Sequence, residues 1–459
     1  MNKFVFSLVL FVLSVIMYLY ADRQYDYLFC LTCTGVFLTN SFMIVRNDIK
    51  EIGLLNFNLL FSLSFFLCSY VFAVILYPSD ILSPLFSYYV SLPEHVINKC
   101  TALCTCAYAI YSCGYFYSYR QKKIKYNSLE IKHGLCNKSY KIYLITFAAL
   151  TINALIYMRT HADSIQVETA PFLAVIFIVA LSTLSYFILN NNKERSFKNI
   201  LLNNKFLIFS IIVVTAVYTV IGDRGLIIQI ALAVICAYSL LVRRIKFVTL
   251  IGLFIIGVVF MYSIRLTRNT DSNISNSGLS SVVQTTSSAM KENNSIFAPF
   301  SDLTERYEEL YLGYDYIQKN GQYYYPLKIV VLLFSPIPFM PSLISSLIYG
   351  VPTNVLSIGT AIGTTWDTTA GTHCVMDSYA PWGLLGMFFV FFVFGGVVRR
   401  ITDKYRLDYR YGVCYIILIT QAIYLPRASL FDVYRPVFWA LFLLYFISKN
   451  SINKKYVKN

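Results

Sequence analysis

Long apolar runs without a charged residue recur along the chain and restrict its possible folds more than any other feature. They occupy roughly residues 4–20, 27–45, 53–77, 101–119, 142–158, 171–190, 206–221, 225–242, 247–264, 382–398, 411–424 and 436–448. A helical run of about 17 to 25 apolar residues matches the hydrocarbon thickness of a bilayer. Only 13% of the residues are charged, against about 25% in soluble domains. We therefore expect an all-α polytopic membrane protein with about 12 transmembrane helices.

The distribution of basic residues predicts the orientation of these helices. If the N-terminus is cytoplasmic, 26 of the 38 Lys and Arg residues fall in cytoplasmic segments and 12 on the other side. Six of those twelve lie in one long external loop, from Arg265 to Tyr379. Because cytoplasmic loops carry the excess of Lys and Arg, we expect both termini in the cytoplasm. The net charge of +15 follows from these loops and gives no reason to infer a nucleic-acid partner.

The long loop contains an apolar stretch that imitates a span. "PLKIVVLLFSPIPFMPSLISSLIYG" (326–350) holds four prolines, which break helix continuity. Counting it as a span would also place the basic segment 399–410 outside. We therefore expect a re-entrant or interfacial pair of short helices. The chain then divides into nine membrane helices (1–264), an external loop (265–379), and three further helices with a cytoplasmic tail (380–459).

Two other segments of the loop have distinct patterns. Residues 301–320 predict an amphipathic helix capped by Ser301 or Asp302, and apolar side chains recur on one face at Leu303, Tyr307, Leu310, Tyr311 and Tyr314. Residues 269–295 are rich in Ser, Asn and Thr and predict a mobile surface segment.

The eleven cysteines do not predict a disulfide framework or a metal site. Most fall within apolar runs, where a cysteine behaves as a small hydrophobic residue. Cys100, Cys104 and Cys106 are closely spaced, but no histidine or carboxylate accompanies them in that run. We therefore expect these thiols to be packing residues.

Ionisable residues are absent from the cores of the twelve runs and gather at their outer ends. Coupled transporters usually need such groups near the bilayer midplane, so their absence disfavours transport. A functional site is therefore expected to face outward, where the following residues lie: Arg159, His161, Asp223, Arg224, Arg265, Arg268, His373, Asp377, Arg427, Asp432 and Arg435.

The sequence "YTVIGDRGLIIQ" (218–229) places two of these charges in a very short turn between two runs. Gly222 and Gly225 let the backbone turn tightly. In one interpretation Asp223 caps the following helix and Arg224 extends to lipid headgroups. In the other, the Arg224 guanidinium and the helix N-terminus together bind a phosphate.

The remaining arginines have similar alternatives. Arg265 and Arg268 lie three residues apart and share one helical face if the helix continues into the loop. Arg427 and Arg435 flank the last external loop, with Asp432 between them. These four arginines are either interfacial anchors and ion-pair partners or ligands for an anionic substrate.

Two carboxylates and a histidine precede the tenth run. "WDTTAGTHCVMDSYAPWGLLG" (366–386) contains Asp367, His373 and Asp377, directly before a membrane helix that Pro381 is expected to open. His373 or one of the aspartates is a candidate general base for a sugar hydroxyl. The alternative is that His373 is an ordinary polar surface residue of the loop.

Taken together, these segments resemble the Wzy-type O-antigen polymerases of bacterial envelopes. The resemblance rests on "GDRG" between two spans, one large late external loop, "GQYYYPLKIVVLLFSPIPFMP" within it, and "DSYAPWGLLGMFF" at the next helix. It covers roughly residues 200–400, and the first half by general architecture. The stretch "FSPIPFMP" departs from the pattern, because no arginine follows its proline.

This resemblance implies a glycosyltransferase of the bacterial inner membrane that needs no nucleotide sugar, metal or other cofactor. Such an enzyme transfers the growing glycan from undecaprenyl pyrophosphate to a hydroxyl of the next lipid-linked repeat unit, in the periplasm, building lipopolysaccharide O-antigen or a similar polysaccharide. Arg224, with Arg265 or Arg268, would hold the pyrophosphate, and His373 or Asp377 would accept the proton.

Membrane lipids and a chain-length regulator protein are the partners that the resemblance implies besides the lipid-linked donor and acceptor. Two alternatives remain open. An O-antigen ligase shares the long loop and the arginines but transfers the glycan to lipid A core. A lipid-linked oligosaccharide flippase would be a transporter, which the charge-free spans disfavour.

Overall fold

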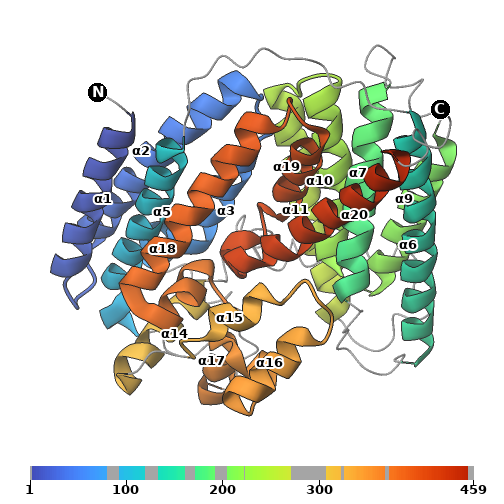
Figure 1. Ribbon diagram of the computed structural model, residues 1–459. Helices are drawn as coiled ribbons and strands as arrows, with labels where there is room; N and C mark the ends of the chain where they lie inside the picture. Colours follow the sequence, from blue (N-terminus) through green and yellow to red (C-terminus); the bar gives the residue numbers. More distant parts are fainter. Residues whose placement is uncertain are drawn as a thin grey trace.

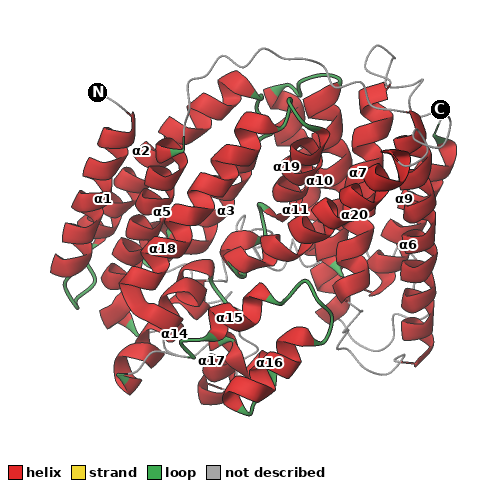
Figure 2. Cartoon of the chain, in the orientation of Figure 1, coloured by secondary structure: helices red, strands yellow, loops and turns green. Residues whose placement is uncertain are grey.

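A computed structural model describes residues 3–79, 93–118, 133–160, 171–191, 204–221, 223–269, 307–321, 325–366 and 372–452. Within these residues the protein is all-helical and has no strand (Figure 2). This agrees with the predicted all-α class.

Each of the twelve apolar runs forms helix. The nine before the long loop correspond to α1 (Lys3–Tyr20), α2 (Tyr27–Glu51), α3 (Phe57–Ser69) with the π-helical turn η1 (Phe72–Leu76), α5 (Ile97–Tyr117), α6 (His133–Thr160), α7 (Pro171–Asn191), α9 (Lys205–Ile221), α10 (Arg224–Leu241) and α11 (Phe247–Asn269). The three after it correspond to α18 (Cys374–Lys404), α19 (Tyr409–Gln421) and α20 (Tyr434–Ile452).

Seven of the helices in the described part of the chain are long and apolar enough to cross a membrane: α1, α2, α6, α7, α10, α18 and α20. The described parts of α3, α9 and α11 are shorter apolar helices. α19 has only 13 residues, and α5 carries amide and hydroxyl side chains along its length. The structure therefore shows a helical membrane protein, but the predicted count of twelve spans is not confirmed.

The helices of the long loop gather at one end of the bundle. α14 (Tyr307–Asn320), α15 (Lys328–Leu333), α16 (Met340–Tyr349) and α17 (Ile358–Trp366) lie at the lower end in Figure 1, while α1 begins and α20 ends at the upper end. The loop helices therefore lie at the end of the bundle opposite the start of α1 and the end of α20 (Figure 1).

The loop helices agree with the sequence pattern where the structure describes them. α14 buries Tyr307, Leu310, Tyr311 and Tyr314 against the bundle, as its amphipathic pattern predicts. Its expected caps and Leu303 lie outside the described residues, as does the segment 270–295. The apolar stretch 326–350 forms two short helices, α15 and α16, because its prolines interrupt a longer one.

α5 is the central helix of the first half and packs closely on α18. A Cβ atom on Gly114 of α5 would lie 2.0 Å from the Phe392 carbonyl oxygen, and one on Gly395 of α18 would lie 2.2 Å from that of Tyr111. Only glycine lets the two backbones approach this closely, as in many membrane helix pairs. The contact fixes α18 against the bundle at the middle of its length.

The cysteines pack as expected from the sequence. All eleven are free, and all except Cys136 are buried. Cys100, Cys104 and Cys106 lie on α5 and are fully buried among apolar side chains. They behave as small hydrophobic residues.

α18 begins earlier than the sequence predicts. Its first residue is Cys374, and His373 is its N-cap. Pro381 therefore lies inside the helix and does not begin it. The helix kinks two residues later, at Gly383 (φ 65°). His373 and Asp377 therefore belong to the start of a long membrane helix, and the expected domain boundary at residue 380 falls within that helix.

Candidate functional site

The "GDRG" turn joins α9 to α10 through a capping aspartate. The Asp223 Oδ1 atom accepts hydrogen bonds from the backbone N–H groups of Gly225 (3.0 Å) and Leu226 (3.4 Å). The predicted cap is therefore confirmed. Because Asp223 occupies these amides, an anion at this helix end would be held by the Arg224 guanidinium rather than by the backbone.

Tyr424, which follows α19, lies beside this turn. Its hydroxyl is buried and has no hydrogen-bond partner among the residues that the structure describes. Asp223, Arg224 and Arg427 all interact electrostatically with it. Burial raises the pKa of the Tyr424 phenol, while the Arg427 guanidinium opposes this shift. Arg224 and Arg427, far apart in the sequence, therefore both lie near enough to the Tyr424 hydroxyl to act on it electrostatically.

Side chains of α10 and α19 connect the two helices near this point. The Gln229 Nε2 atom donates to the Gln421 Oε1 atom at 3.4 Å. The helices also pack along their lengths. The placement of Arg224 and Arg427 near Tyr424 is therefore supported by helix packing and does not depend on a loop alone.

Asp377, in the first turn of α18, lies in a second polar group nearby in the fold. Its Oδ1 atom forms an ion pair with Lys328 of α15, and its Oδ2 atom accepts a hydrogen bond from the Ser429 hydroxyl at 2.5 Å. The Lys328 and Asp377 side chains are only 8% and 2% exposed. Asp432 interacts electrostatically with Asp377, Lys328 and Arg435.

One short segment links the two polar groups. The 3₁₀ turn η6 (Leu425–Arg427) carries Arg427, and η7 (Leu430–Val433) is capped by Ser429, whose backbone N–H donates to Asp432 at 3.2 Å. η6 and η7 both contact α18, and η7 also contacts α19 and α20. The connection between α19 and α20 therefore gathers the charged residues of four helices at one end of the bundle.

His373 is fully buried, not exposed in a loop. Its Nδ1 atom accepts from the Val375 backbone N–H at 3.3 Å, and its Nε2 atom lies 3.1 Å from the Ser69 hydroxyl. Burial lowers the pKa of the imidazole to about 3, so the ring is neutral and Nε2 carries the proton. Neither nitrogen then has a free lone pair, and this geometry favours a capping role over a general base.

The other predicted arginines are partly described. α11 continues to Asn269, so Arg265 and Arg268 lie on one unbroken helix, three residues apart. Their side chains lie outside the described residues, as do that of Arg159 and the loop residues His161 and Asp367. Arg435 lies at the start of α20, beside Asp432.

Lys328 is a site residue that the sequence interpretation missed. It is the only charged residue between 326 and 350, and a single lysine within such an apolar stretch is itself a signal. A buried ammonium requires a partner, which here is Asp377.

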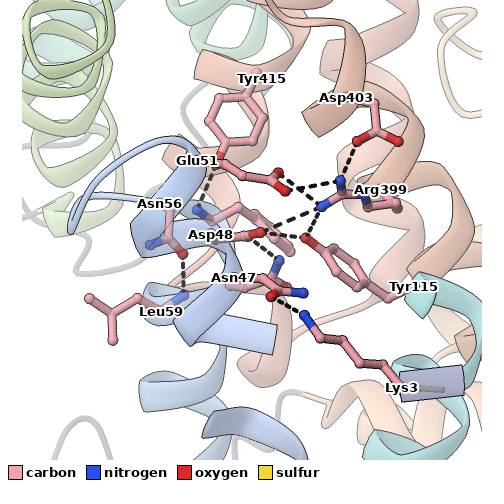
Figure 3. Close-up of polar contacts among 12 residues, drawn as sticks. Lys3, Asn47, Asp48, Glu51, Asn56, Leu59, Tyr115, Arg399, Asp403 and Tyr415 are labelled. Atoms are coloured by element: carbon pink, nitrogen blue, oxygen red, sulfur yellow. Dashed lines mark hydrogen bonds and ion pairs between the residues drawn. The ribbon is translucent and has the colours of Figure 1, made fainter. Parts of the chain in front are cut away.

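A charged network at the opposite end of the bundle was also missed (Figure 3). The Arg399 guanidinium, near the end of α18, lies between Glu51 (3.2 Å), Asp403 (2.5 Å) and the Tyr115 hydroxyl (2.9 Å), with Asp48 at 3.9 Å. The sequence predicts solvated loops here. Instead α2 and α18 extend beyond their apolar runs and bury Arg399 and Asp48 between helices, while Glu51 and Asp403 stay partly exposed.

Asp48 is fully buried in this network. Its carboxylate accepts hydrogen bonds from the Tyr115 hydroxyl and from the Asn58 Nδ2 atom, the latter at 2.6 Å. Both carboxylate oxygens are therefore paired. This arrangement connects α2, α3, α5 and α18 and is expected to stabilise the bundle.

The fold and these charged groups define a helical membrane protein with a polar site at the end of the bundle that carries the loop helices. Comparison of the chain with protein-family models, with curated proteins and with solved structures found no match.

Proposed function

We propose that this protein polymerises oligosaccharide repeat units linked to undecaprenyl pyrophosphate, by glycosyl transfer at the end of the bundle that carries α14 to α17. The observation that supports this most is that Arg224 and Arg427, from distant parts of the sequence, both act electrostatically on the buried Tyr424 hydroxyl. Two guanidinium groups at the end of membrane helices suit a pyrophosphate carried by a lipid. The resemblance of "GDRG" and the late external loop to Wzy-type polymerases supports the same reaction.

In the proposed reaction, the acceptor hydroxyl oxygen forms a bond to the anomeric carbon of the donor glycan. The bond from that carbon to the pyrophosphate oxygen breaks, and undecaprenyl pyrophosphate leaves. Arg224 and Arg427 stabilise the negative charge that develops on the leaving group. Asp377 accepts the proton of the acceptor hydroxyl. Arg435, with Arg265 and Arg268, contributes further binding to the pyrophosphate or the glycan.

The proposal places the protein in the bacterial inner membrane, with both termini cytoplasmic and the long loop periplasmic. The site then faces the compartment that holds the assembled lipid-linked repeat units. A chain-length regulator is a proposed protein partner.

The test uses the purified full-length chain in proteoliposomes with undecaprenyl-pyrophosphate-linked repeat units. Product length is followed on gels. We expect a ladder of polymers with the wild type, and a loss of about 10²-fold in kcat with Arg224→Ala or Arg427→Ala, since each removes a charge-assisted contact to the leaving group. Arg243→Ala is the matched control, because Arg243 is exposed just beyond the other end of α10.

Each other outcome has a definite meaning. A wild-type chain that makes no polymer, but transfers preformed polymer to lipid A core, would replace polymerase with ligase. Movement of lipid-linked units between leaflets without any new glycosidic bond would indicate a flippase. Full activity of both arginine variants would remove the pyrophosphate site from this position.

A further inference from the structure

A buried ion pair connects the long external loop to the start of α18. Lys328 lies on α15, in the loop, and Asp377 lies one turn into α18. Ser429, between η6 and η7, donates to the second oxygen of the same carboxylate at 2.5 Å. Three separate segments of the chain therefore meet at one carboxylate, which is almost inaccessible to solvent.

The ion pair and the Ser429 hydrogen bond fix the orientation of this carboxylate. Burying an ionised carboxylate without a cation is costly, and Lys328 supplies a cation in direct contact. Ser429 holds the other oxygen, so the carboxylate cannot rotate freely. An ionised carboxylate has about four acceptor positions, so Lys328 and Ser429 do not use all of the hydrogen bonds that this carboxylate can accept.

We propose that Lys328 is a positioning residue, which holds the Asp377 carboxylate in the orientation that accepts the proton of the acceptor hydroxyl. This inference rests on the proposed function. Lys328 itself transfers no proton in this scheme. The external loop therefore contributes to the reaction through α15, by completing the environment of a group that belongs to the membrane bundle.

The experiment measures kcat and KM for repeat-unit transfer in proteoliposomes, for Lys328→Met, Lys328→Arg and the control Lys319→Met. Lys319 is a suitable control because it also pairs with an aspartate of the loop, Asp315 (2.7 Å), but is 66% exposed. We expect Lys328→Met to lower kcat about 10²-fold, the lower range for loss of a general base, with KM within about twofold of wild type. Lys328→Arg is expected to recover part of the loss, and Lys319→Met to change neither constant.

The charge swap, Lys328→Asp combined with Asp377→Lys, separates positioning from a purely structural role. It restores a buried pair but moves the carboxylate to α15. We expect the swapped chain to accumulate and unfold like the wild type yet remain inactive. If Lys328→Met does not accumulate, the activity of the folded swapped chain still tests whether the carboxylate must lie at position 377.

Two results would overturn the inference while leaving the polymerase proposal intact. One is an unchanged kcat in Lys328→Met, and the other is recovery of turnover in the swapped chain. An inactive wild-type chain would instead reject the proposed function itself, and the role of Lys328 with it.

Discussion

Replacing Arg399 by methionine is expected to destabilise the protein strongly, through the network at the end of α18 opposite the candidate site. The guanidinium contacts Glu51, Asp403 and Tyr115 and lies near Asp48. Methionine has a similar length and fills part of the space but removes the cation that pairs with Glu51 and Asp403 and lies near Asp48. Breaking a buried ion pair by removing one partner typically costs about 3–5 kcal/mol.

The structure places this variant near the lower end of that range. Asp48 is fully buried but keeps its hydrogen bonds from Tyr115 and Asn58. The Glu51 side chain is 39% exposed. Water therefore screens its charge, and losing its ion pair with Arg399 contributes little to the destabilisation. Asp403 is 22% exposed and loses its closest partner. We therefore expect a loss of about 3 kcal/mol in the free energy of unfolding.

The assay is reversible unfolding of the purified chain in detergent micelles, followed by circular dichroism. Arg400→Met is the matched control, because Arg400 is the next residue of α18 and is exposed; its change is expected to be within about 0.5 kcal/mol. Adding Asp48→Asn to Arg399→Met should recover part of the loss, since the uncompensated charge is then removed. Equal stability of the Arg399→Met and Arg400→Met chains would refute the structural role of this network.

Two further predictions concern the contacts that fix α18. Gly395→Ala places a Cβ atom 2.2 Å from the Tyr111 carbonyl oxygen, and a backbone atom cannot move aside, so we expect a loss of about 3 kcal/mol or more in unfolding free energy; Gly257→Ala, whose Cβ meets nothing within 4 Å, should cost nothing, and equal effects of the two would contradict the close packing. The second concerns pH. The pKa of His373 falls from 6.5 to about 3 on folding, so the native state disfavours its protonation, and stability present above pH 6.5 is lost as the pH falls from 6.5 towards 3. At pH 5 this loss in the free energy of unfolding is about 2 kcal/mol. It is measured by comparing the pH dependence of unfolding with that of His373→Asn, which should lack this part. Identical pH profiles of the two chains would exclude the buried neutral ring.

The sequence predicted the helical positions well because the apolar runs follow directly from burial of the chain in a bilayer. The short helices of the 326–350 stretch followed from its prolines, and the cap at Asp223 followed from its place before an apolar run. Each of these depends on neighbouring residues in the sequence. Such local rules do not require knowledge of which helices are in contact.

The environment of individual polar residues was much less predictable. His373 looked like a loop residue because Pro381 seemed to begin the helix, whereas the helix begins at Cys374 and buries the ring. The sequence shows Lys328 only as one charge of the long loop. Its partner Asp377 lies 49 residues away, and a local pattern does not show such a pairing. The placement of Arg224 and Arg427 near Tyr424 depends on the packing of α10 against α19, which no local pattern encodes.

α18 connects the two charged regions of the protein, and this explains how a site built from distant segments is held in place. Its first turn carries Asp377, its middle packs on α5 through Gly395, and its last turns carry Arg399. The kink at Gly383 separates residues 374–382, which include Asp377, from the rest of α18, so the packing on α5 alone does not orient Asp377. The Asp377 carboxylate is instead contacted by Lys328 and Ser429, which come from the long loop and from the connection between α19 and α20. Variants at Arg399 and Gly395 should therefore lower the amount of folded protein, whereas variants at Lys328 should lower the activity of each folded molecule.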